Sequence, residues 1–318
     1  MRFDRLDWRI VRELFHWGSS TFPVGPLRVS LQGIASQVGV HRNTILARVR
    51  AMRKAGVLEG QVFEPRPGTV GLVRSGYLLH GTPSRDGEEL LEALRRFPCI
   101  SAFVQCRGVA FVHLWHDPGD SPKAAAQAVR QALGARSLIE GYVSTKFTAE
   151  ENGMSRPSPF EVRMMLALRR APTLPMSAVA RELGVTTRTA ERRAAALIER
   201  GAGAMVPLFR PGRVEGWILV HYVPLERDER AAAGLVRAFP DRVVGPFSPR
   251  QIPTVLVPLE SLSEVERRRR EAERVPGVGP LMPVLVQDIT YPRAFEGWLA
   301  PRVESAQVRV ASLQVHDA

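Results

Sequence analysis

The hydrophobic positions of the chain follow helical spacing in its first 54 residues. Residues 3–15 and 34–38 place apolar side chains three and four residues apart, which is the spacing of one helix face. A third stripe runs along residues 42–54 and consists of Ile45, Val49 and Met52. Gly39 precedes this stripe, and a residue without a side chain readily takes the left-handed turn that reorients the chain. The pattern predicts three helices, of which the last two form a helix-turn-helix.

The same pattern occurs a second time further along the chain. The stretch IASQVGVHRNTILARVRAMRKAG, which starts at Ile34, aligns without gaps on VARELGVTTRTAERRAAALIERG, which starts at Val179. The alignment pairs Gly39 with Gly184, so the turn between the helices recurs. A duplicated unit of about 145–150 residues therefore accounts for most of the chain.

Each copy continues into a block where short apolar runs of strand length alternate with helical patterns. Residues 75–147 and 216–291 both follow the order strand, helix, strand, strand, helix, strand. This is the order of a ferredoxin-like domain, whose sheet carries helices on one face and leaves the other face free to pair with a second copy. Apolar residues 57–63 and 204–209, which precede these blocks, predict a small wing in each unit.

These patterns predict an α+β fold in which two winged helix-turn-helix domains alternate with two ferredoxin-like domains. The expected boundaries are 1–66 and 156–212 for the helix-turn-helix domains, 70–150 and 214–299 for the ferredoxin-like domains, and 300–318 for a C-terminal tail. Because one chain carries both copies, we expect it to behave as a pseudo-dimer, with further homo-oligomerisation left open.

Positive charge is concentrated in the two predicted helix-turn-helix domains. The chain has 44 Lys and Arg against 32 Asp and Glu, a net charge of +12. Residues 1–66 hold +6 and residues 156–213 hold +7, whereas the two blocks of strands are nearly neutral. Two basic modules that alternate with two neutral ones are typical of a protein in which two modules bind a polyanion.

The third helix of each copy is the predicted DNA-reading element, because the first turn of such helices contacts phosphates and base edges. In the first copy the candidate DNA contacts are His41, Arg42, Asn43, Thr44, Arg48 and Arg50. In the second copy they are Thr186, Thr187, Arg188, Thr189, Arg192 and Arg193. The third helix of the second copy is rich in alanine, so the alternative for that copy is a degenerate module with a packing role.

The helix-turn-helix with its opening acidic helix, followed by a βαββαβ block, resembles the Lrp/AsnC (feast/famine) transcription regulators in a tandem form. The resemblance implies paired sheet domains, double-stranded DNA as partner and a small effector such as an amino acid. The family usually carries a glycine followed three residues later by an aspartate between the second and third strands. Here Phe111 stands three residues after Gly108, and residues 245–254 lack the pattern.

The predicted function is therefore sequence-specific DNA binding by a transcription regulator, without enzymatic activity and without a cofactor. The competing class is an enzyme, because siroheme decarboxylases are similar in architecture and bind a tetrapyrrole between their sheet domains. A nonspecific architectural DNA-binding protein is a third alternative. The sequence contains no phosphate loop, dinucleotide fingerprint, Gly-x-Ser-x-Gly or His-Glu-x-x-His motif, so no catalytic residue is assigned.

Several other features favour structural explanations. His113 and His116 are three apart on a predicted strand and so face opposite sides, which argues against a metal site and for one core and one surface histidine. In residues 266–274 glutamates flank a run of arginines, and the resulting i,i+4 charge pairs indicate a solvated helix face. Cys99 and Cys106 fit no zinc spacing. The absence of a long apolar run predicts a cytoplasmic chain with no membrane partner.

Overall fold

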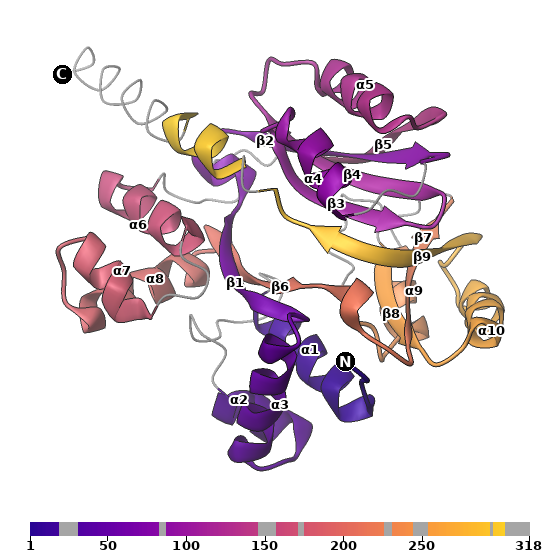
Figure 1. Ribbon diagram of the computed structural model, residues 1–318, viewed down its shortest axis with the longest axis horizontal. Coiled ribbons are helices and arrows are strands. Elements are labelled where there is room, and N and C mark those ends of the chain that lie inside the picture. Colours follow the sequence, from indigo (N-terminus) through magenta and orange to yellow (C-terminus); the bar gives the residue numbers. More distant parts are fainter. Residues whose placement is uncertain are drawn as a thin grey trace.

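Figure 1 shows the computed structural model, in which two groups of helices lie beside a large twisted sheet flanked by further helices. The structure describes residues 1–18, 31–82, 87–145, 157–170, 175–225, 231–243, 254–292 and 295–302.

The predicted helix-turn-helix units are both present. The first consists of α1 (Arg5–Gly18), α2 (Leu31–Val38) and α3 (Arg42–Lys54), and the second of α6 (Pro159–Arg170), α7 (Met176–Glu182) and α8 (Thr187–Glu199). Gly39 and Gly184 take positive φ angles of 74° and 68° at the turn between the last two helices, as predicted. Thr186 caps α8, because its side chain accepts a hydrogen bond from the backbone N–H of Thr189 at 3.2 Å.

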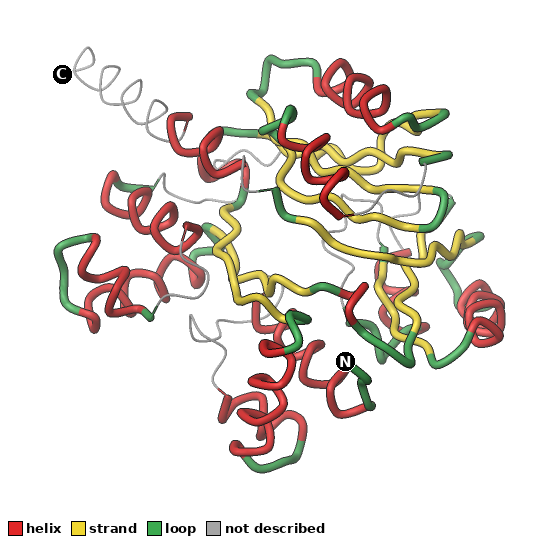
Figure 2. The backbone as a smooth tube through the Cα atoms, in the orientation of Figure 1, coloured by secondary structure: helices red, strands yellow, loops and turns green. Residues whose placement is uncertain are grey.

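The strands that follow the two units pair with each other. Strand β1 (Leu58–Pro65) runs antiparallel to β6 (Gly203–Phe209), with Val62 opposite Val206. The sequence predicted a separate wing within each unit, whereas the two strands form one ribbon that joins the units. Figure 2 shows this ribbon as a pair of yellow strands between the two groups of red helices. The short 3-10 helices η1 (Pro67–Val70) and η3 (Pro211–Arg213) follow the strands.

The two βαββαβ blocks contribute to one sheet of seven described strands, in the order β5-β2-β4-β3-β9-β7-β8. The first block comprises β2 (Val73–His80), α4 (Gly87–Arg95), β3 (Ile100–Cys106), β4 (Val109–His116), α5 (Pro122–Leu133) and β5 (Ser137–Thr145). The second comprises β7 (Ile218–Pro224), α9 (Ala231–Ala238), β8 (Val255–Leu259), α10 (Leu262–Glu273) and β9 (Leu281–Thr290). The strand predicted at 242–247 lies mostly outside the described residues.

The two halves of the sheet meet both at an edge and across their faces. Strand β3 pairs antiparallel with β9, with Phe103 opposite Thr290. On the faces not covered by α4, α5, α9 and α10, Phe111 and Leu78 of the first block share a hydrophobic cluster with Val223 and Val284 of the second. This arrangement confirms the expectation that the free sheet faces of the two copies pair within one chain.

Each helix-turn-helix unit packs on the sheet half of the other copy. The first unit shares a core with the second block, in which Trp8 lies 5.8 Å from Phe209 and 6.0 Å from Trp217 between ring centroids. The second unit shares a core with Trp115 of the first block and with Phe295 of the helix at 295–302. The two copies are therefore interlocked.

Close packing of the ribbon gives a testable prediction at Gly203. A Cβ added there would lie 2.5 Å from the Glu64 carbonyl oxygen and 2.5 Å from Cζ of Phe63, so the backbone of β1 would have to move. We expect Gly203→Ala to lower the free energy of unfolding by about 1–3 kcal/mol in chemical denaturation. Gly119→Ala is the matched control, because a Cβ there has nothing within 4 Å. Equal unfolding midpoints for the two variants would contradict the packing described for the ribbon.

Candidate functional site

The face between the two halves of the sheet carries a group of polar side chains. In the β2–β4 ladder, Arg74 lies opposite Trp115, Gly76 opposite His113 and Leu78 opposite Phe111. Residues two apart on a strand share a face, so Arg74, Phe111, His113 and Trp115 all lie on the same side of the first block. Helices α4 and α5 cover the other side.

The second block contributes a histidine to the same space. Tyr222 of β7 packs under α9 and α10, so its neighbour His221 points to the opposite face, between the sheet halves. The His221 ring is 4.5 Å from the Phe111 ring between centroids and tilted by 53°. His221 is 7% exposed. Side chains from both copies of the repeat therefore meet at this site.

Burial makes both imidazoles neutral at ordinary pH. Desolvation, followed by the positive charges of Arg74 and of a protonated His221, lowers the pKa of His113 to about 3. Burial alone lowers the pKa of His221 to about 3. The face thus combines a guanidinium and two imidazoles, which is a donor set suited to an anion.

These depressed pKa values predict that the protein loses stability in mild acid. Between about pH 6.5, the usual histidine pKa in an unfolded chain, and about pH 3, the unfolded state binds protons that the folded state does not. The free energy of unfolding should therefore fall as the pH falls through this window, by at most about 1.4 kcal/mol per pH unit for each histidine. Urea unfolding at pH 7.5 and pH 5 measures this slope. His221→Asn should flatten it, whereas the exposed His80→Gln should not, and equal slopes would contradict the assignment.

His113 and His116 face opposite sides of the sheet, as the strand pattern predicted. His116 lies on the helix-covered side, where its Nε2 is 2.9 Å from Oγ of Ser75. Among the described residues no group of three or more His, Cys, Asp or Glu side chains is arranged to hold a metal ion. The interpretation of His113 as an ordinary core histidine missed its neighbours Arg74 and His221. The sequence offered one signal for this cluster. Its residues belong to sheet domains that were expected to have one face free of helices.

The predicted DNA contacts of the first copy lie on the outer side of α3, with one exception. His41, Arg42, Asn43, Thr44 and Arg50 are exposed. Arg48 is only partly exposed, because its guanidinium pairs with Asp4 at 2.9 Å and with the fully buried Asp7 at 3.1 Å.

In the second copy, several predicted contacts also have internal roles. Thr187, Arg188 and Arg192 are exposed. The hydroxyls of Thr186 and Thr189 lie 2.9 Å apart at the start of α8. Arg193 places Cζ 5.9 Å from the centroid of the Phe160 ring. Contact with DNA by either set stays a prediction.

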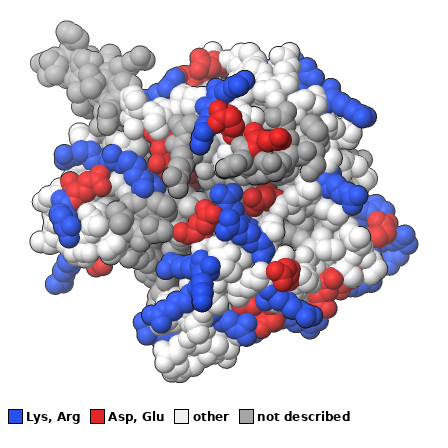
Figure 3. All heavy atoms as spheres, in the orientation of Figure 1, with Lys and Arg blue, Asp and Glu red and all other residues white. Residues whose placement is uncertain are grey.

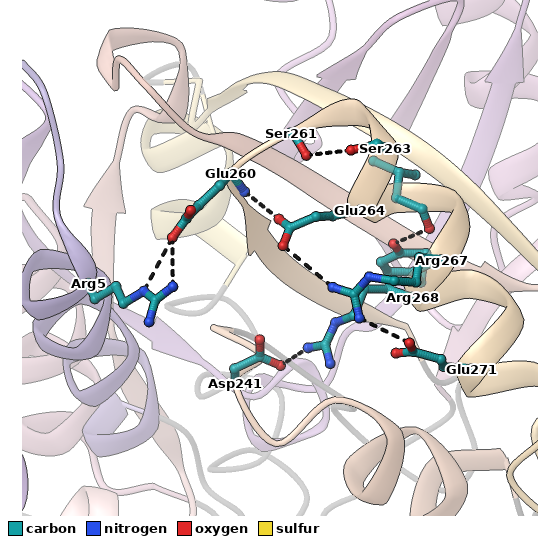
Figure 4. Close-up of polar contacts among 11 residues, drawn as sticks. Arg5, Asp241, Glu260, Ser261, Ser263, Glu264, Arg267, Arg268 and Glu271 are labelled. Carbon is teal, nitrogen blue, oxygen red and sulfur yellow. Dashed lines mark hydrogen bonds and ion pairs between the residues drawn. The ribbon is translucent and has the colours of Figure 1, made fainter.

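The arginine-rich helix α10 has the charge pairs expected of a solvated face. Arg267 pairs with Glu271 at 3.0 Å, and Arg269 pairs with Glu273 at 2.8 Å. Figure 4 shows that part of this network continues to other elements, through Arg268 to Asp241 and through Arg5 of α1 to Glu260. These contacts tie the first helix-turn-helix unit to the second sheet block.

The chain has a tandem architecture in which helix-turn-helix units alternate with ferredoxin-like blocks. Comparisons with known proteins found structures of similar architecture. No family model and no curated protein sequence matches the chain. Among solved structures, the siroheme decarboxylase NirDL is similar at 11% identity and a TM-score of 0.49, covering 96% of this chain and 100% of that one. NirDL in complex with an iron-uroporphyrin III analogue matches at 11% identity and 0.48, covering 90% and 97%.

The solved structure of a transcriptional regulator is similar to about half of this chain. An AsnC family transcriptional regulator from Agrobacterium tumefaciens matches at 19% identity and a TM-score of 0.29, covering 47% of this chain and 99% of the regulator. The share of this chain that the match covers is about the length of one copy of the repeat.

One expectation from the sequence is corrected by these comparisons. The absence of familiar catalytic motifs suggested that the chain is not an enzyme, but two solved structures similar to it along nearly its whole length are those of an enzyme. In the part of the chain that the structure describes, no helix is long and apolar enough to cross a membrane.

Proposed function

We propose that this chain binds a carboxylated tetrapyrrole between its two sheet blocks and removes a carboxyl group from it as CO2. The observation that carries the proposal is the meeting of Arg74, His113 and His221 on the inter-sheet face, with both copies of the repeat contributing. The siroheme decarboxylase of similar architecture supplies the substrate class to be tested.

The residues of this face suit such a ligand. The Arg74 guanidinium presents paired N–H donors that match the two oxygens of a carboxylate. Neutral imidazoles can donate a hydrogen bond to a carboxylate or ligate an iron centre through nitrogen. The Phe111 ring and the apolar side chains around it in the inter-sheet cluster favour a large, flat organic group over a small hydrated anion. The bound substrate would supply the ring system that accepts electron density.

Proton supply is the part of the reaction that falls to the protein. When the carbon–carbon bond to a carboxylate breaks, its electron pair stays on the substrate carbon, and one proton must reach that carbon as CO2 leaves. His113 and His221 are the groups on this face that can carry a proton. A substrate carboxylate beside them would raise their pKa from about 3 towards neutrality, because an opposite charge stabilises the imidazolium.

Absorbance titration with iron-uroporphyrin III tests the binding step. We expect saturable spectral changes with one tetrapyrrole bound per chain. Arg74→Gln should weaken binding by about 10-fold to 100-fold, the usual effect of removing a charge-assisted hydrogen bond. Arg95→Gln removes the same charge from the exposed face of α4 and is the matched control. No spectral change, or equal affinities for the two variants, would contradict the proposed site.

A second candidate function is sequence-specific binding of double-stranded DNA in transcription regulation. The observation that favours it is the exposed, positively charged outer face of α3, with Arg42 and Arg50 directed to solvent. Under this candidate function an amino acid or similar effector would act through the sheet blocks. Binding should weaken steeply with salt, because each phosphate contact releases counterions, and a flat salt response in an anisotropy assay would count against DNA as the ligand.

A further inference from the structure

We propose that this protein holds duplex DNA with one of its two reading helices, through the outer face of α3, while α8 serves mainly to pack its own unit. This inference rests on the DNA-binding candidate function and is independent of the tetrapyrrole site.

The two reading helices differ sharply in charge although they align without gaps. Helix α3 carries five cationic side chains and no acid, whereas α8 carries three arginines and two glutamates. Glu191 lies immediately before Arg192, so the outer face of α8 would place a carboxylate near the phosphates that its arginine would contact. Figure 3 shows Lys and Arg gathered over the lower part of the molecule, around α3, and mixed signs over the α6–α8 unit.

Four of the five cationic side chains of α3 are exposed to solvent. Arg42, Arg50, Arg53 and Lys54 are exposed, and none of them forms an ion pair with another described residue. Only Arg48 is engaged, by Asp4 and Asp7, and this pairing fixes α3 against α1. A helix that is fixed to its domain and exposes cationic side chains on its outer face can bind in the major groove of DNA.

In the second unit, several polar side chains of α8 make contacts within the unit, as His41 and Arg48 do in the first. Thr186 and Thr189 bond each other and the helix N-terminus. Arg193 lies over the Phe160 ring of α6, and Arg200 pairs with Glu161 at 2.8 Å. The inner side is formed by small residues, with Ala190 and Ala194 fully buried. The small buried residues and the mixed charge of α8 favour a packing role for this helix.

Duplex DNA is the occupant that this surface fits. The exposed charges on α3 are all positive, which complements a regular polyanion. The first turn carries Arg42 and Asn43, whose side chains can reach base edges as well as phosphates, while the His41 side chain caps the helix by accepting from the Asn43 backbone N–H at 3.2 Å. An anionic vesicle or single-stranded RNA would use the charge but not these hydrogen-bonding groups.

Anisotropy titrations with duplexes selected from a random library by the full-length protein test the inference. Two variants remove two charges each: Arg42→Ala with Arg50→Ala on α3, and Arg188→Ala with Arg192→Ala on α8. Arg267→Ala with Arg274→Ala on α10 controls for net charge. We expect the α3 variant to bind at least about tenfold more weakly, with the slope of log K against log salt reduced by about 0.9 for each phosphate that the variant no longer neutralises. The α8 and α10 variants should stay within about threefold of the parent, and thermal unfolding should confirm that all three are folded.

The outcomes separate this inference from the candidate function beneath it. If the parent protein does not bind duplex DNA, or prefers RNA or anionic vesicles, the DNA-binding function fails and the inference fails with it. If the parent binds but the α8 variant is weakened as much as the α3 variant, DNA binding stands and the one-sided assignment is wrong. Equal weakening of all three variants would show attraction by net charge alone and overturn the α3 assignment.

Discussion

Replacing Glu64 by Gln is expected to lower the free energy of unfolding by about 3–5 kcal/mol, because it leaves a buried cation without its counter-charge. The cation is Arg169 of α6, which is 3% exposed. Its Nη1 donates to the Glu64 carboxylate on β1 and to the Phe63 carbonyl oxygen at 3.3 Å. Its Cζ lies 4.6 Å from the centroid of the Phe295 ring. One side chain thus joins the second helix unit, the ribbon and the last described helix.

A double-mutant cycle in urea distinguishes the removal of an ion pair from general disruption. Combining Glu64→Gln with Arg169→Met should recover much of the stability, since no unpaired charge then remains. The exposed pair Arg95–Glu92 provides the control, and Glu92→Gln should cost less than about 1 kcal/mol. Strictly additive effects of the two Glu64 and Arg169 substitutions would show that the pair is not coupled as described.

Separating the two copies of the repeat is expected to abolish cooperative folding of each half. In the intact chain, Trp8 and Ile10 of the first copy lie in one core with Phe209 and Leu219 of the second. A polypeptide of residues 1–150 would expose these apolar side chains, and burying one such large side chain contributes about 1.5–3 kcal/mol. We expect broad, non-cooperative thermal transitions for residues 1–150 and 151–318 measured alone.

Mixing the two halves should restore the intact protein's behaviour. A one-to-one complex with a sharp unfolding transition in circular dichroism is the expected result, because all the packed surfaces are then present again. A sharp transition for either half by itself would contradict the interlocked packing. A half lacking one large side chain, such as Trp8→Ala, should reassociate more weakly and so tests the same packing in graded form.

The repeat and the local elements could be predicted from the sequence because they depend on short-range signals. The spacing of Ile45, Val49 and Met52 determines which face of α3 is buried, and all three are buried in the structure. Gly39 and Gly184 mark turns that require positive φ. The charge pairs along α10 follow from spacing on a single helix. The domain boundaries given above stay a prediction.

Features that depend on contacts between the copies could not be predicted in the same way. Nothing local in residues 57–63 indicates that their strand pairs with β6 of the other copy instead of forming its own wing. The engagement of Arg48 depends on Asp7, which lies on another helix. The cluster of Arg74, His113 and His221 is formed by strands from both halves. The alternation of apolar and polar residues in one strand shows only which side of the sheet each side chain is on. The residues that it contacts there depend on long-range pairing between the strands.

The most direct test of the central claim is to incubate the purified protein with siroheme and follow the tetrapyrrole by mass spectrometry. The account predicts that the tetrapyrrole loses the mass of CO2, one carboxyl group at a time, and that His113→Ala and His221→Ala proteins still bind siroheme but slow or abolish this reaction. A folded protein that binds siroheme stoichiometrically and leaves its mass unchanged, or histidine variants that decarboxylate at the parent rate, would contradict the account.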